Sequence, residues 1–120
     1  MHDHALDSWT GALTGLGESP QPTELESWQF AALRRALAYA VERSRFYREL
    51  YAGIDIAGIN SRHDLARLPL IDSDVLRRRG GELVCLPQTQ IERISSMLSS
   101  GSTGQPKRIY FSAADLEHTV

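Results

Sequence analysis

The residues with the most distinctive chemistry lie in one short stretch, residues 99–107, with the sequence SSGSTGQPK. Serine and threonine hydroxyls can donate hydrogen bonds to an anion, and glycine lets the backbone approach a ligand closely. Successive backbone N–H groups in such a turn can converge on a phosphate, and Lys107 adds a full positive charge. We predict a triphosphate-binding loop in which Lys107 is the catalytic residue. Its binding residues are Ser99, Ser100, Gly101, Ser102, Thr103, Gly104 and Lys107.

Two other interpretations of this stretch are weaker. The Walker-type phosphate loop has the pattern G-x-x-x-x-G-K-[ST] and opens a helix, whereas Gly101 and Gly104 lie closer together and Pro106 precedes the lysine. A serine- and glycine-rich run is most often just a flexible loop. The Pro-Lys ending and the strands that we predict on either side, over residues 91–98 and 108–111, argue against a plain loop without function.

The stretch resembles the phosphate-binding signature of the adenylate-forming enzymes, the superfamily of acyl-CoA synthetases, luciferases and peptide-synthetase adenylation domains. That signature is a serine or threonine followed by Ser-Gly-[Ser/Thr]-Thr-Gly-x-Pro-Lys, and the chain matches it from Ser99 to Lys107. Members of the family usually carry a glycine soon after the lysine, and Arg108 stands there in this chain.

Two further segments resemble the phenylacetate-CoA ligase branch of this superfamily. Residues 38–51 are similar to its opening helix, its Ser-Pro-Phe-Tyr-like turn and its second short helix, with Arg45 in place of the proline. Residues 63–76 carry its Leu-x-x-Leu-Pro step followed by a capped helix. The three segments follow one another in the same order as in that branch, so the resemblance extends over roughly residues 33–112.

The resemblance implies an α/β fold, with a helical first part followed by strands and a phosphate-loop hairpin. It implies the N-terminal portion of an ATP-dependent acyl-adenylating enzyme, an acid–thiol ligase similar to acyl-CoA synthetases. Such an enzyme joins a small carboxylic acid to ATP with release of pyrophosphate, and then passes the acyl group to CoA or another thiol. It uses ATP, Mg²⁺ and CoA.

The resemblance also implies that the adenine, ribose and acyl sites lie downstream of these residues. We therefore expect the chain alone to be inactive and its partner to be the remainder of the same enzyme, with a homodimer as a further option. A net charge of −2 gives no electrostatic argument for binding nucleic acid or a membrane. The lone Cys85 and the lack of a secretory leader or long apolar run favour a cytoplasmic location.

We expect residues 1–22 to be poorly ordered, because glycines and prolines interrupt any regular period there. Residues 23–120 would form the N-terminal part of an AMP-binding large domain, incomplete because the last helix has a start and no end. Capping boxes are predicted at three pairs, Thr23 with Glu26, Ser61 with Asp64, and Ser112 with Asp115. The predicted helices cover residues 23–44, 45–52, 65–68, 74–79 and 113 onward, and a further strand covers 82–87.

Two other classes of function stay open. The chain could be a stand-alone helical protein-binding module with a degenerate loop, which requires an exposed apolar face around Phe46, Tyr47 and Tyr51. It could instead be a phosphotransferase, for which Asp115 and Glu117 are the carboxylates nearest the loop in sequence.

We predict no metal site of the protein's own, because His2 and His4 have no third ligand nearby. The run of arginines from 77 to 79 is interpreted as the polar end of a helix, and Cys85 as a small apolar residue.

Overall fold

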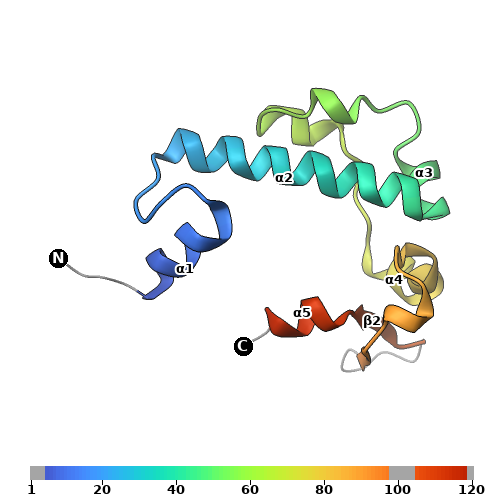
Figure 1. Ribbon diagram of the computed structural model, residues 1–120. Helices are drawn as coiled ribbons and strands as arrows, with labels where there is room; N and C mark the ends of the chain where they lie inside the picture. The colour runs from blue at the N-terminus through green and yellow to red at the C-terminus, as the bar shows by residue number, and fades with distance from the viewer. Residues whose placement is uncertain (1–4, 98–104, 119–120) are drawn as a thin grey trace. The chain divides into compact units, whose positions relative to one another are not determined.

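The computed structural model describes residues 5–97 and 105–118, and its elements are shown in Figure 1. The longer elements are α1 (Ala5–Thr14), α2 (Pro22–Arg43), α3 (Arg45–Leu50), α4 (Ser73–Arg79), β1 (Arg93–Met97), β2 (Lys107–Phe111) and α5 (Ala113–Glu117). Short 3₁₀ helices lie between them, namely η1 (Ile56–Gly58), η2 (His63–Arg67), η3 (Gly80–Leu83) and η4 (Gln88–Gln90). This mixture of helices with one small antiparallel sheet is compatible with the predicted α/β class. No helix in the described part of the chain is long and apolar enough to span a bilayer.

The chain divides into two compact units. The first unit comprises residues 1–37 and 55–66, and the second comprises residues 38–54 and 67–120. The boundary predicted at residue 22 separates no such unit, and that assignment of domains stays a prediction.

In the first unit, α1 covers residues 5–14 of the segment that we expected to be poorly ordered, so the glycines and prolines there do not prevent a helix. The glycines here allow a turn and a close backbone contact, and they do not interrupt the helix. Gly15 and Gly17 have φ angles of +70° and +85°, so they turn the chain back after the helix. A Cβ on Gly11 would lie 2.8 Å from the carbonyl oxygen of Gly17, so only glycine fits at this crossing.

The start of α2 also differs from the prediction. Pro22 is the first helical residue, a position that suits proline because its missing N–H would have no partner there. The Glu24 carboxylate accepts a hydrogen bond from the backbone N–H of Gln21 at 2.9 Å. The predicted Thr23–Glu26 capping box is therefore wrong, and Glu26 instead pairs with Arg62 at 3.4 Å.

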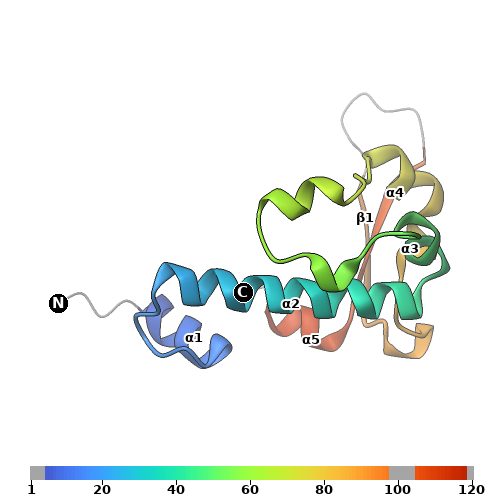
Figure 2. The same cartoon turned by 90° about the horizontal axis from the view of Figure 1, so that it is seen from above.

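Helix α2 has an apolar face. Phe30 and Leu37 are buried, seven residues apart on one side of the helix, and Ile59 from the connecting segment is fully buried in the same unit. Arg34 of α2 donates from Nη1 to the carbonyl oxygen of Ile59 at 2.8 Å and to Asn60 Oδ1 at 2.9 Å. In Figures 1 and 2 this segment runs alongside α2.

The predicted capping box of the connecting segment is present. The Asp64 carboxylate accepts from the Ser61 N–H at 3.0 Å, and the Ser61 hydroxyl accepts from the Asp64 N–H at 3.4 Å. The helix that follows, η2, is a 3₁₀ helix over His63–Arg67. The prediction of a helix here is confirmed in place, although its geometry is tighter than that of an α-helix.

The second unit is built around Ser44 and Phe46. Ser44 caps α3 by accepting a hydrogen bond from the Tyr47 N–H at 3.3 Å. Its hydroxyl also donates to the carbonyl oxygen of Glu82 at 2.7 Å, which ties α3 to η3. The Phe46 side chain is only 5% exposed, and the Arg79 guanidinium lies 4.7 Å from the centre of its ring.

Helix α4 begins as predicted, because the Asp72 carboxylate accepts a hydrogen bond from the Val75 N–H at 2.9 Å. It passes directly into η3, and the chain from 84 to 87 then runs on without a partner strand among the described residues. The strand predicted over residues 82–87 is therefore wrong. Four consecutive half-buried residues from Leu83 to Leu86 gave an apolar run, and such a run does not distinguish a strand from other buried structure.

Strands β1 and β2 pair in antiparallel fashion, with Ile94 opposite Tyr110 and Met97 opposite Lys107. Both strands were predicted, and both are confirmed. Helix α5 follows β2 and opens with the predicted capping box between Ser112 and Asp115, in which both reciprocal hydrogen bonds are present. Helix α4 and η3 contact β2, so these three elements form the frame of the site described next.

Candidate functional site

The two strands end at the predicted phosphate loop. Ser99, Ser100, Gly101, Ser102, Thr103 and Gly104 lie outside the described residues, so their role stays a prediction. Gln105 and Pro106 lead into β2, and Lys107 is its first residue, half-buried and paired with Met97. The strand pair therefore holds the base of the loop at a fixed register, and of the predicted site residues the structure places Lys107 alone.

The two cations that follow the loop belong to different faces of β2. Successive side chains of a strand point to opposite sides, so Lys107 shares its face with Ile109 and Phe111. Arg108 shares the other face with Tyr110. Arg108 is exposed whereas Lys107 is half-buried. A single small anion bound on one face of the strand would contact one of these cations and not the other.

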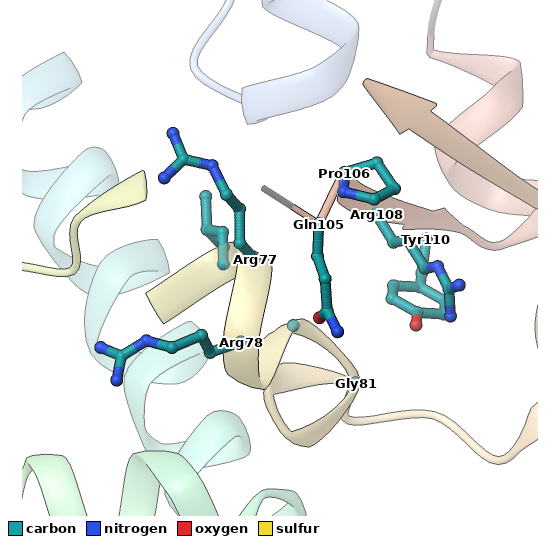
Figure 3. Close-up of a pocket in the computed structure, with 9 residues that line it drawn as sticks. Arg77, Arg78, Gly81, Gln105, Pro106, Arg108 and Tyr110 are labelled. Atoms are coloured by element: carbon teal, nitrogen blue, oxygen red, sulfur yellow. The ribbon is translucent and has the colours of Figure 1, made fainter. Parts of the chain in front are cut away.

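A cavity of about 380 Å³ lies on the Arg108 face, between β2 and the junction of α4 with η3. Figure 3 shows Gln105 reaching toward the turn that holds Gly81, with Arg108 and Tyr110 to one side of it. Gly81 lies beside Tyr110 at this wall of the cavity, since a Cβ on Gly81 would make an ordinary contact with the Tyr110 hydroxyl oxygen at 3.7 Å. The described lining residues are Leu76, Arg77, Arg78, Gly80, Gly81, Gln105, Pro106, Arg108 and Tyr110.

The cavity carries an excess of positive charge. None of its described lining residues is acidic. Asp74, which lies outside the lining, pairs with Arg77 at 3.3 Å and with Arg78 at 3.2 Å and offsets part of their charge. Arg108 makes no ion pair with any residue that the structure describes, so no described carboxylate offsets its charge.

The third arginine of the run, Arg79, has a structural role. It pairs with the Glu82 carboxylate at 2.7 Å and lies over the ring of Phe46. The hydrogen bond from Arg79 holds the pKa of the Glu82 carboxyl below its usual range. The interpretation of the run as the polar end of a helix is supported for Arg79, whereas Arg77 and Arg78 also contribute to the cavity.

Sequence reasoning did not find the residues of this cavity. Arg108 attracted notice only because it stands where a glycine is usual. The alternation of residues 106, 108 and 110 along a strand is the signal that places them on one face. Their position against α4 and η3 depends on contacts between segments far apart in sequence, which no local pattern contains.

The residues that the two alternative functions would use do not lie in surroundings that suit those functions. Phe46 is buried, and Tyr47 and Tyr51 are half-buried and stacked at 5.7 Å, so the exposed apolar face that a protein-binding module requires is absent at these residues. The Asp115 carboxylate is engaged with Ser112 in the cap of α5, and this lowers its pKa. Cys85 is half-buried, and burial raises the pKa of its thiol.

Comparison with known proteins adds an independent observation. Over 97 residues the chain is 34% identical to the phenylacetate-coenzyme A ligase of Thermus thermophilus. The chain resembles phenylacetate-coenzyme A ligase. The match covers 78% of this chain and 21% of the ligase, so the chain spans about a fifth of the length of the curated relative that it matches. No family model matches the chain.

This similarity confirms the resemblance inferred from the sequence. It supports a ligase at a coarse level, and it rests on a fifth of that ligase's length. The structure adds that the base of the loop is held by a strand pair, with one cation on each face of β2. Such a frame can present positive charge to a phosphorylated ligand from either side.

Proposed function

We propose that the protein is part of an ATP-dependent acyl-adenylating ligase similar to phenylacetate-coenzyme A ligase. The similarity to that ligase is the observation that carries the proposal, and the SSGSTGQPK stretch supplies the chemistry. In the proposed reaction a small carboxylic acid attacks the α-phosphorus of ATP, which gives an acyl-adenylate and pyrophosphate. A thiol, of which CoA is the expected one, then takes the acyl group.

The loop residues would act on the departing pyrophosphate. Negative charge grows on its oxygens as the bond to the α-phosphorus breaks, and fixed donors already in place stabilise that charge. Backbone N–H groups, the hydroxyls of Ser102 and Thr103, and the Lys107 ammonium group are the donors. The register of β1 with β2 fixes the backbone of Lys107, and this limits the positions that its side chain can reach.

Lys107 meets the electrostatic requirement for an ATP site. It makes no ion pair with a described residue, so its charge is not offset within that part of the protein. The described residues contain no group of three or more His, Cys, Asp or Glu side chains placed to hold a metal. Mg²⁺ is commonly held through substrate phosphates with few protein carboxylates, so it would enter with the nucleotide. CoA and the acid would bind to parts of the enzyme beyond these residues.

The proposal is tested by carboxylate-dependent exchange of radiolabelled pyrophosphate into ATP. The natural protein that carries this chain is assayed with a panel of small carboxylic acids, starting from phenylacetate. We expect Lys107→Ala to lower the exchange rate about a hundredfold, the usual effect of removing one donor to a developing charge. Gly104→Val should lower it as well, because a side chain would displace the bound phosphates.

Arg93→Ala is the matched control. Arg93 is an exposed cation of β1 in the same strand pair. It pairs with Phe111, at the end of β2 away from Lys107, and it does not line the cavity beside α4. Its removal should leave exchange unchanged. Full exchange in both the Lys107 and the Gly104 variants would refute the role given to the loop.

A further inference from the structure

We propose that the cavity between β2 and the α4–η3 junction is a second anion site, which binds a phosphate group through Arg108, Tyr110 and Gln105. This site lies on the opposite face of β2 from Lys107. It is therefore distinct from the pyrophosphate contact proposed for Lys107, and it does not depend on the chemistry of adenylation.

The donors of the site come from one strand and the residue just before it. Arg108 and Tyr110 are two apart on β2 and so share a face. Gln105 reaches into the same space from the other side, as Figure 3 shows. Together they offer a guanidinium fork, a phenolic hydroxyl and an amide NH₂ group, which are all hydrogen-bond donors to phosphate oxygens.

The charge of the site favours an anion. Arginine stays protonated at any physiological pH and can bind a phosphate with two parallel hydrogen bonds. Arg108 has no ionic partner among the described residues, whereas Arg77 and Arg78 share Asp74 and point away from Gln105 in Figure 3. Arg108 is thus the cation of the site, and the two helix arginines contribute a weaker background field.

The shape of the site fits a small polar group. A volume of about 380 Å³ leaves room for a phosphate with several waters. The backbone of Gly80 and Gly81 forms its floor, with the nearest atoms to their added Cβ positions at 3.7 Å. A larger side chain at residue 81 would fill the space that a phosphate needs, and a Cβ there would make only an ordinary contact with Tyr110.

The phosphate could belong to the nucleotide on the neighbouring loop or to a separate phosphorylated ligand. Inorganic phosphate serves as the probe because it shares the chemistry of both. The isotope-labelled chain is titrated with sodium phosphate at neutral pH and constant ionic strength, and binding is followed by NMR at the backbone amides of Gly80 and Gly81 and the side-chain N–H of Arg108. We expect saturable shifts at these positions.

The variants separate a built site from general attraction to positive charge. Arg108→Gln should weaken phosphate binding about tenfold, the loss expected for one charge-assisted hydrogen bond. Arg93→Gln removes the same charge from the neighbouring strand and should leave the affinity unchanged. Tyr110→Phe should weaken binding a fewfold, and Gly81→Val should abolish it while the rest of the spectrum is retained.

Equal weakening by Arg108→Gln and Arg93→Gln would overturn the proposal, as would the absence of saturable shifts at Gly80 and Gly81. If Arg108→Gln fails to fold, Arg108→Lys and Gly81→Val take its place, because both variants keep a cation at residue 108. Loss of phosphate binding in Gly81→Val would then support the site, and unchanged binding would overturn it.

Competition between ATP and phosphate at Gly81 would assign the site to the nucleotide. Phosphate shifts that ATP leaves unchanged would assign it to another ligand. Pyrophosphate exchange is scored separately with Lys107→Ala, so failure of one proposal does not imply failure of the other.

Discussion

Neighbouring residues on a strand can carry the same charge and act in different places. Lys107 and Arg108 are adjacent, yet the alternation of β2 directs one to the half-buried face and the other to the cavity. Sequence patterns count both as basic residues after a loop. The alternation of side chains along β2 places them on opposite faces, so a small anion bound on one face would contact only one of them, and this division is the basis of both proposals.

Cys85 gives a prediction at the scale of one residue. Burial raises the pKa of its thiol, so the thiol stays protonated to a higher pH than in an unfolded chain. Thiolate is the form that reacts with alkylating reagents. We therefore expect the alkylation rate of the folded chain to rise at a higher pH than that of the chain unfolded in urea. The measurement is the rate of reaction with iodoacetamide as a function of pH in the two states.

A midpoint in the folded chain equal to or below that of the unfolded chain would contradict this account of Cys85. It would point to an activated thiol and reopen the question of a role in catalysis. Accessibility alone would slow the reaction at every pH without moving the midpoint, so the midpoint is the quantity that decides.

At the scale of elements, helix caps were the most predictable features. Ser44, Asp72 and Ser112 each form a hydrogen bond to a backbone N–H three residues later, an interaction contained within one turn of chain. The start of α2 was misplaced because two acidic residues, Glu24 and Glu26, stand near the helix start, and the contact of Glu26 with Arg62 comes from elsewhere in the chain. Local interactions could be read from sequence, and competing distant ones could not.

The candidate site shows the same division. The strands on either side of the loop and the cation at Lys107 were predicted, because periodicity and a specific motif signal them locally. The cavity was not, because it needs α4 and η3 packed on β2. Likewise, the hydrogen bond from Ser44 to the Glu82 carbonyl joins residues 38 apart, and no periodic pattern encodes it.

Gly11 gives a prediction at the scale of the helix. Alanine is favoured over glycine inside a helix by about 1 kcal/mol, so Gly11→Ala would ordinarily stabilise α1. Here the added Cβ would lie 2.8 Å from the backbone oxygen of Gly17. Overpacking of this kind costs about 1–3 kcal/mol. We expect Gly11→Ala to lower the free energy of unfolding, measured by urea denaturation.

Gly80→Ala is the matched control for this change. Gly80 has a helical φ of −52°, and an added Cβ would make only an ordinary contact at 3.7 Å. Its replacement should leave stability unchanged or raise it slightly, since it restricts the unfolded chain. Stabilisation by Gly11→Ala would show that the crossing of Gly11 and Gly17 is looser than described.

At the scale of the whole molecule, the chain matches about a fifth of the length of a ligase. The second unit holds both strands and the cavity, whereas the first unit is held by Ile59 and the Arg34 hydrogen bonds. The proposed chemistry therefore needs residues beyond those described. We propose that the protein transfers an adenylyl group to a carboxylate.

The most direct test of that claim follows the oxygen atoms of the acid. The natural protein is incubated with ATP, Mg²⁺, CoA and an acid that supports exchange, the acid carrying a heavy oxygen isotope in its carboxylate. If the carboxylate attacks the α-phosphorus, thiol attack on the acyl-adenylate leaves one of those oxygens on AMP. The account predicts heavy AMP by mass spectrometry. Heavy orthophosphate accompanied by ADP would contradict it, because the acid would then have been phosphorylated.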